Sequence, residues 1–313
     1  MTRLRSQAAR DSLLRRVRRQ RLKYITILPS LITILNGICG FTAIVFASKA
    51  AIDGPNDFYY HRLHLSYFAM SGYMILLAMI ADMLDGRVAR MSKSTSSFGG
   101  QLDSLSDIIS FGVAPAFLML KILEYKLAIL LEYSPGLENF LERFIWFAAA
   151  AYISCAAIRL ARFNVENEED ETAHMSFMGL PTPAAAGVIV SLVIFHEETL
   201  EDLAAKGTQA YWIFENVIMY ALPIFVLGTA ALMVSRIRYP HILNQYIKGK
   251  KPFAHFIRVM VFVGLIIWSR QTAMVLIFCG FALYGFAKWL YYKVILKKDT
   301  YVTAMETQQD QAL

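Results

Sequence analysis

Paired cysteines, histidines at ligand spacing and internal repeats are all missing from this sequence of 313 residues. Its three cysteines, Cys39, Cys155 and Cys279, lie in separate apolar stretches, so neither a disulfide framework nor a zinc site is indicated. The six histidines show no ligand spacing either. We therefore interpret the cysteines as packing residues and the histidines as ordinary side chains.

Apolar residues make up 57% of the chain, far above the share in an ordinary soluble domain. The basic N-terminus precedes an apolar segment about as long as a bilayer span, without a small-residue cleavage site, so we expect the segment to be retained. Eight segments long enough, or nearly so, to cross a bilayer predict an all-α polytopic transmembrane helix bundle. Their ranges are 26–50, 64–86, 101–123, 143–163, 181–197, 211–235, 253–269 and 271–294. The fifth is short, and only Arg270 separates the last two, so the count is open by one pair.

The net charge of +7 is carried mainly outside the apolar segments, which favours lipid head groups over nucleic acid as partners. Most of the 31 Lys and Arg residues fall on one side of the bundle if the N-terminus is inside. Because positive loops stay cytoplasmic, we expect an integral membrane protein with both termini in the cytoplasm.

Composition divides the chain into four parts. Residues 1–25 are basic and predict an interfacial helix on anionic lipid, with a disordered arm as the alternative. Residues 26–236 form a helical core, and 237–298 add two transmembrane helices to which we assign no chemistry. Residues 299–313 form a polar tail.

Carboxylates inside membrane spans are costly, so those that persist there are candidates for function. Asp82 and Asp85 are spaced i, i+3 at the inner end of the second predicted span, and Asp103 and Asp107 are spaced i, i+4 at the inner start of the third. Each pair therefore shares one helix face. Small residues surround these acids, which lets a phosphate ligand approach the backbone.

Four carboxylates on facing helices cannot all be ionised at close range without a cation to neutralise them. Hard divalent ions, Mg²⁺ or Mn²⁺, are the natural partners of such oxygen ligands. Two of these ions would clamp a diphosphate and stabilise in-line displacement at phosphorus. The alternatives are cytoplasmic salt bridges between the acids and nearby Arg and Lys residues, or a cation transporter whose acids bind the permeating ion.

The spacing Asp-x2-Asp-Gly-x2-Ala-Arg-x8-Gly-x3-Asp-x3-Asp, from Asp82 to Asp107, resembles at every position the signature of the CDP-alcohol phosphatidyltransferase family. The resemblance implies that Asp82, Asp85 and Asp103 are metal ligands, and that Asp107 is the general base, which also touches a metal in some members. It further implies that the nucleotide and its diphosphate are lined by Gly86, Ala89, Arg90 and Gly99. The family's six-helix core would correspond to roughly the first six spans.

The acceptor alcohol has to be inferred from other parts of the chain. Four stretches are similar to phosphatidylserine synthases within that family, and they begin at Pro29, Ser110, Cys155 and Gly179. The similarity implies CDP-diacylglycerol and L-serine as substrates, with transfer on the cytoplasmic face. Glycerol 3-phosphate, an inositol-type alcohol or an archaeal ether-lipid substrate is the alternative, and a homodimer is left open.

Arg159 and Arg162 share one helix face near the inner end of the fourth span, with Asn164 beside them. A guanidinium fork suits a carboxylate, so we expect one of these arginines to hold the serine carboxylate. The alternative is that both arginines are positive-inside anchors. Asn36, in the first span, is interpreted as a contact between helices, with a hydrogen bond to substrate as the alternative.

Overall fold

The computed structural model describes residues 30–50, 65–92, 97–130, 135–169, 177–200, 210–239, 269–291 and 293. The first helix is Ser30–Ala50. It is followed by α2 (Tyr67–Ser92), α3 (Ser97–Asp107), the π-helix η1 (Ile108–Val113), α4 (Ala114–Leu130), α5 (Pro135–Glu169), β1 (Phe177–Met178), α6 (Thr182–Phe195), the π-helix η2 (His196–Leu200), α8 (Ala210–Val234), β2 (Arg238–Tyr239) and α11 (Arg270–Leu290).

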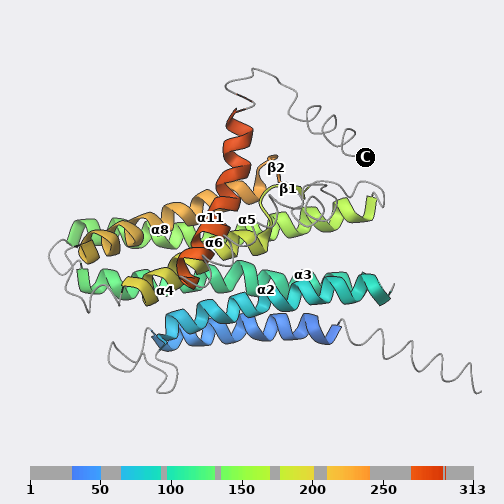
Figure 1. The fold of residues 1–313 in the computed structure, drawn as a ribbon, viewed down its shortest axis with the longest axis horizontal. Coiled ribbons are helices and arrows are strands. Elements are labelled where there is room, and N and C mark those ends of the chain that lie inside the picture. Colours follow the sequence, from blue (N-terminus) through green and yellow to red (C-terminus); the bar gives the residue numbers. More distant parts are fainter. Residues whose placement is uncertain are drawn as a thin grey trace, which may run out of the picture.

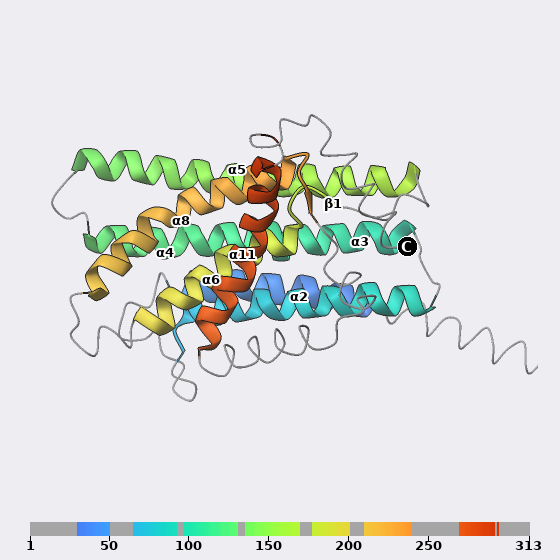
Figure 2. The ribbon, with the colours of Figure 1, turned by 45° about the horizontal axis from the view of Figure 1, so that its top comes forward.

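Apart from α11, the described helices form one bundle and run roughly along its long axis (Figure 1). The first helix and α2 lie together on one side, next to the continuous rod made by α3, η1 and α4 (Figures 1 and 2). The helix α6 packs against α2, α4, α5, α8 and α11, and 11 of its residues are buried. A helix that is apolar on all its faces is stable only when neighbours surround it, which explains its central position.

The bundle is that of a membrane protein, as the sequence predicts. Five helices are long and apolar enough to cross a bilayer, namely Ser30–Ala50, Tyr67–Val88, Phe98–Leu127, Asn139–Val165 and Arg270–Leu290. Eight spans are not confirmed, because α6 has 14 residues and the apolar part of α8 is Tyr220–Val234. Nearly all of the seventh predicted span, and both the basic segment 1–25 and the tail 299–313, lie outside the described residues.

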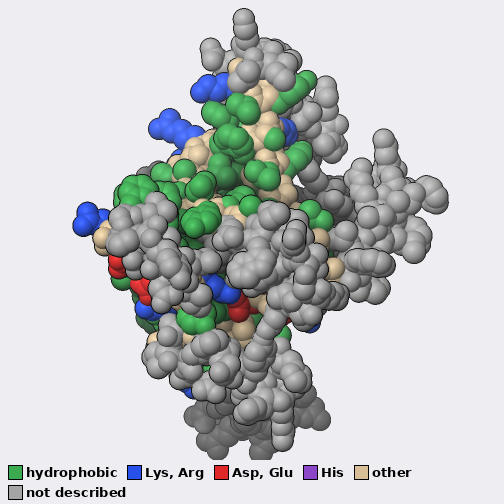
Figure 3. All heavy atoms as spheres, turned by 90° about the vertical axis from the view of Figure 1, so that its left-hand side faces the viewer, with side chains coloured by type: hydrophobic (Ala, Val, Ile, Leu, Met, Phe, Trp, Pro, Cys, Tyr) green, Lys and Arg blue, Asp and Glu red, His purple; other side chains and the backbone are tan. Residues whose placement is uncertain are grey.

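The outer surface of the bundle is largely hydrophobic. On the first helix, Leu31, Ile34, Leu35, Ile38 and Phe41 are all exposed, and their spacing places them on one stripe. Hydrophobic side chains also cover much of the projecting helix α11 at the top of Figure 3. Such a surface is compatible with hydrocarbon rather than with water.

The helix α11 crosses the bundle steeply and is tied to it at its first turn (Figure 1). Glu198 of η2 accepts hydrogen bonds from Tyr73 Oη of α2 (2.6 Å) and from Arg270 Nη2 of α11 (3.1 Å). The Arg270 guanidinium also lies 5.3 Å from the centre of the Tyr73 ring. One carboxylate thereby connects three helices.

The first helix crosses α3 and η1 at very short range. Gly37 faces Ser106, and Gly40 faces Ser110, whose hydroxyl donates to the main-chain oxygen of Asn36 (2.9 Å). A Cβ atom at Gly40 would lie only 2.7 Å from Ser110 Cα. Small residues on both partners are what allow two membrane helices to approach so closely.

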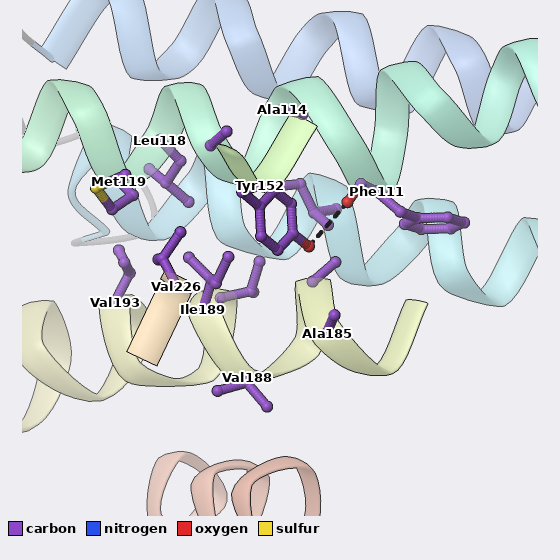
Figure 4. Close-up of a cluster of buried hydrophobic side chains, with 14 of the residues drawn as sticks. Phe111, Ala114, Leu118, Met119, Tyr152, Ala185, Val188, Ile189, Val193 and Val226 are labelled. Carbon is purple, nitrogen blue, oxygen red and sulfur yellow. Dashed lines mark hydrogen bonds between the residues drawn. The ribbon is translucent and has the colours of Figure 1, made fainter. Parts of the chain in front are cut away.

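The π-helix η1 begins directly after Asp107 and is followed by Pro115. Proline has no N–H, so it cannot donate to the carbonyl of Phe111 four residues earlier. The Tyr152 hydroxyl of α5 donates to that carbonyl instead (3.0 Å), from the middle of the buried core shared by α4, α5 and α6 (Figure 4). This contact fixes the irregular turn against α5. Single π-turns of this kind often occur at functional sites.

A two-residue ladder closes the loop before α6. Phe177 and Met178 of β1 pair antiparallel with Tyr239 and Arg238 of β2. Gly179 has φ +78°, a backbone conformation that residues with a side chain rarely adopt. Its N–H donates to the carbonyl of Ile237 (2.8 Å). The ladder therefore anchors the start of α6 to the segment that follows α8.

Candidate active site

Acidic side chains from the C-terminal part of α2 and from α3 meet at one place. Asp82, Asp103 and Asp107 each offer a carboxylate oxygen, and the three atoms lie within 4.8 Å of one another. Asp85, one turn after Asp82, is buried. The arrangement of α2 and α3 thus brings one acid of the first pair and both acids of the second pair to one place, and Asp85 lies one turn away.

The first helix supplies hydrogen-bond donors to two of these acids. Asn36 Nδ2 donates to Asp107 Oδ1 (2.9 Å), and Thr33 Oγ1 donates to Asp85 Oδ2. The two donors are three residues apart and therefore lie on one face of the helix. The interpretation of Asn36 as a contact between helices is correct, but its partner is the expected general base.

The carboxylate oxygens of this cluster are suitable ligands for a hard divalent cation. Three carboxylates this close together repel one another unless a proton or a cation neutralises them. All the offered atoms are carboxylate oxygens, which Mg²⁺ and Mn²⁺ prefer over nitrogen or sulfur ligands. Asp82, Asp103 and Asp107 are therefore the residues that could hold such an ion, with Asp85 adjacent to them.

Of the residues expected to line a nucleotide, Gly86 lies where the helix surface is open. Gly86 is exposed, and a Cβ atom built on it would meet no atom within 4 Å. Gly99 is partly buried in the first turn of α3. Ala89 and Arg90 belong to the last part of α2, and the positions of their side chains lie outside the described residues.

The residues expected to bind the acceptor lie on α5, where it passes α3. Arg159 is buried with 9% exposure, and its Nη1 donates to Thr182 Oγ1 (3.1 Å). The helix α5 that carries Arg159 packs against η1, which begins directly after Asp107. Asn164 exchanges hydrogen bonds with Ser104 of α3 at 2.9 and 3.1 Å. Asn164 is thereby held against α3, at the residue that follows Asp103.

Arg162 points to a different neighbour. Its Nη2 lies 3.1 Å from the sulfur of Met178 in β1. Thioether sulfur is a weak acceptor, so this contact holds the guanidinium less firmly than the Thr182 hydroxyl holds Arg159. The structure thus separates the two arginines that the sequence treats alike.

Sequence reasoning missed three of the residues that organise this site. Thr33 lies in the stretch that begins at Pro29, and Thr182 lies in the stretch that begins at Gly179. Both stretches were recognised, but the sequence did not indicate which residues the two threonines contact. Ser104 lies between two of the acids, where its spacing relative to Asp107 gave no separate signal. Their partners are 52, 23 and 60 residues away in the chain.

Comparison with known proteins agrees with the geometry. The family model for CDP-alcohol phosphatidyltransferase matches residues 26–227. The chain is 32% identical to a CDP-diacylglycerol--serine O-phosphatidyltransferase of Helicobacter pylori over 235 residues, which is 74% of this chain and 85% of the relative. A protein of the same name from Methanocaldococcus jannaschii is 29% identical over 217 residues, covering 69% and 83%. One from Saccharomyces cerevisiae is 34% identical over 166 residues, covering 51% of each chain.

Proposed function

The chain belongs to the CDP-alcohol phosphatidyltransferase family, and from that membership we propose that it transfers the phosphatidyl group of CDP-diacylglycerol to the hydroxyl of L-serine. The products are phosphatidylserine and CMP. The observation that carries this proposal is the meeting of Asp82, Asp103 and Asp107 at one point. The names of the relatives, from a bacterium, an archaeon and a yeast, support serine as the acceptor.

Two divalent ions, Mg²⁺ or Mn²⁺, would supply charge neutralisation for the diphosphate and for the oxygen that leaves with CMP. Asp82, Asp85 and Asp103 are assigned as their ligands; Asp107 offers an oxygen to the same cluster as Asp82 and Asp103, and Asp85 lies one turn after Asp82. Thr33 orients the carboxylate of Asp85 from the first helix. Gly86, Ala89, Arg90 and Gly99 are assigned to the nucleotide and its diphosphate, because small residues leave room and a guanidinium matches phosphate.

In the transfer step, Asp107 takes the proton from the serine hydroxyl. The hydroxyl oxygen forms a bond to the phosphorus that carries diacylglycerol, and the bond from that phosphorus to the oxygen of CMP breaks. Asn36 keeps the carboxylate of Asp107 in one orientation through the 2.9 Å hydrogen bond, which preorganises the base. The proton ends on Asp107, and CMP leaves with the electron pair of the broken bond.

Arg159 is the residue best placed to bind the serine carboxylate. It is buried, and Thr182 orients it from the start of α6. A buried guanidinium binds a carboxylate more strongly than an exposed one, because water competes less. Asn164, held by Ser104, is assigned to the same wall of the acceptor site, and Arg162 to its edge near β1.

The site is assigned to the cytoplasmic side of the membrane. With the eight spans that the sequence predicts, most lysines and arginines fall on the side where α2 ends and α3 begins, and positive loops stay in the cytoplasm. Both termini are assigned to the same side. A homodimer stays a prediction.

Release of CMP by the purified protein tests the proposal directly. We expect release from CDP-diacylglycerol only when L-serine and Mg²⁺ or Mn²⁺ are both present, and loss of release when the divalent ion is chelated. Competing alcohols, glycerol 3-phosphate and inositol, serve as controls. CMP release that depends on one of these alcohols and not on serine would refute serine as the acceptor. Absence of release with every alcohol would refute the transfer itself.

A further inference from the structure

The amide of Asn36 has one bonded end and one unbonded end. Its side chain is completely buried, and Nδ2 donates to Asp107 Oδ1 at 2.9 Å. Its other atom, Oδ1, is buried and has no hydrogen-bond partner. The two ends are not interchangeable, because only an NH₂ group can donate to a carboxylate. A buried acceptor without a partner is uncommon in native structures and calls for an explanation.

The unbonded oxygen lies close to the point where the acceptor reacts. In an amide the oxygen and nitrogen are about 2.2 Å apart, so Asn36 Oδ1 is no more than about 5 Å from the Asp107 oxygen that its nitrogen binds. In serine, the hydroxyl and the amine stand on adjacent carbons and are about 3 Å apart in a gauche rotamer. A serine whose hydroxyl contacts Asp107 therefore brings its amine within reach of Asn36.

The hydrogen-bonding groups of the acceptor and of Asn36 match. Arg159, oriented by Thr182, is assigned to the acceptor's carboxylate, so the ammonium group of the same molecule needs a separate acceptor. An ammonium group has only donors, which match an unbonded carbonyl oxygen. The hydrogen bond would form out of contact with bulk water, where it is strongest.

We propose that Asn36 determines the specificity for an amino alcohol, by accepting a hydrogen bond from the α-ammonium group of the acceptor through Oδ1 while Nδ2 holds Asp107. The inference rests on the proposed function, because it takes the acceptor hydroxyl to react at Asp107. Inositol and glycerol 3-phosphate carry a neutral hydroxyl on the carbon next to the reacting one, so either of them would give the Asn36 oxygen a weaker hydrogen bond than an ammonium group does.

The test compares L-serine with 3-hydroxypropionate, which keeps the hydroxyl and the carboxylate but has no amine. We expect Asn36→Leu to lower the ratio of kcat/KM for the two acceptors by about ten- to a hundredfold, the value of one hydrogen bond to a charged group. If turnover of the analogue is too slow to measure, its inhibition constant against L-serine replaces its kcat/KM. Asn36→Ala repeats the measurement if the leucine variant does not fold.

Two further variants separate recognition of the amine from orientation of the base. Asn36→Asp keeps acceptor oxygens but replaces the NH₂ donor with a second carboxyl group beside Asp107, which disturbs the base, so we expect lower turnover with the preference for L-serine retained. Thr33→Val removes the donor to Asp85. It should lower kcat/KM for both acceptors by the same factor, so that the ratio of the two values is unchanged. An Asn36→Leu enzyme that is slower with both acceptors by the same factor would overturn the proposal. So would an Asn36→Asp enzyme that loses the preference. Wild-type protein that releases no CMP with L-serine would instead refute the proposed function.

Discussion

Replacing Gly40 with alanine tests whether the close approach of the first helix positions the acids. The added Cβ would lie 2.7 Å from Ser110 Cα and 3.0 Å from Ser110 Cβ, whereas carbon atoms normally pack at about 3.5–4.0 Å. The first helix therefore has to move away from η1 by about 1 Å. Overpacking of this size costs about 1–3 kcal/mol of stability.

The same movement reaches the acids through Asn36, which lies one turn before Gly40. A displacement of about 1 Å lengthens its 2.9 Å hydrogen bond to Asp107 beyond the usual limit. Misplacing a catalytic group by that amount reduces the rate by about a hundredfold. We therefore expect kcat of Gly40→Ala, measured as CMP release at saturating substrates, to fall by that order.

Other glycines provide the controls. A Cβ at Gly228 of α8 would meet no atom within 4 Å, so Gly228→Ala should leave kcat unchanged. A Cβ at Gly37 would lie 3.3 Å from Ser106 Oγ, and Gly37→Ala should have an intermediate effect. Ser110→Ala should not rescue Gly40→Ala, because the clash with the Ser110 Cα remains. A Gly40→Ala enzyme with wild-type turnover would refute the assigned role of this helix crossing.

Three further changes test the site and its support. Asp107→Asn should lower CMP release by about 10²–10⁴-fold while the KM for CDP-diacylglycerol stays within about threefold, and a nearly active variant would contradict the assignment of the base. Arg159→Lys loses the planar fork and the bond to Thr182, so the KM for L-serine should rise about tenfold, whereas a change confined to CDP-diacylglycerol would speak for a different ligand. Tyr152→Phe leaves the Phe111 carbonyl without the hydroxyl that contacts it, and the free energy of unfolding in detergent should fall by about 1–3 kcal/mol. An unchanged stability of that variant would show that water or main chain satisfies the carbonyl.

Hydropathy alone does not separate a helix that faces lipid from one that faces protein. The segment at 181–197 has the composition of a membrane span, and the structure places α6 there, followed by η2 and packed against α2, α4, α5, α8 and α11. An apolar stretch records only that its side chains avoid water, and both lipid and protein satisfy that requirement. Which of the two surrounds the helix depends on its neighbours.

The pairing of the four aspartates was predictable because it depends on helical periodicity within α2 and within α3. The π-helical turn after Asp107 was harder to predict from the sequence. It lies just before Pro115, and its Phe111 carbonyl accepts a hydrogen bond from the hydroxyl of Tyr152 on another helix. The difference between Arg159 and Arg162 was not predictable either. It depends on where the ladder of β1 and β2 places Thr182 and Met178.

The sequence by itself determined the chemistry of this protein: apolar runs that require a membrane, and carboxylates at spacings that place each pair on one helix face. Only the tertiary structure decided which donors reach those carboxylates, because the bonds from Thr33 to Asp85 and from Asn36 to Asp107 join residues 52 and 71 positions apart. Local periodicity acts within a single helix. The distance between two helices is decided by the side chains that meet where they cross, here glycine against serine.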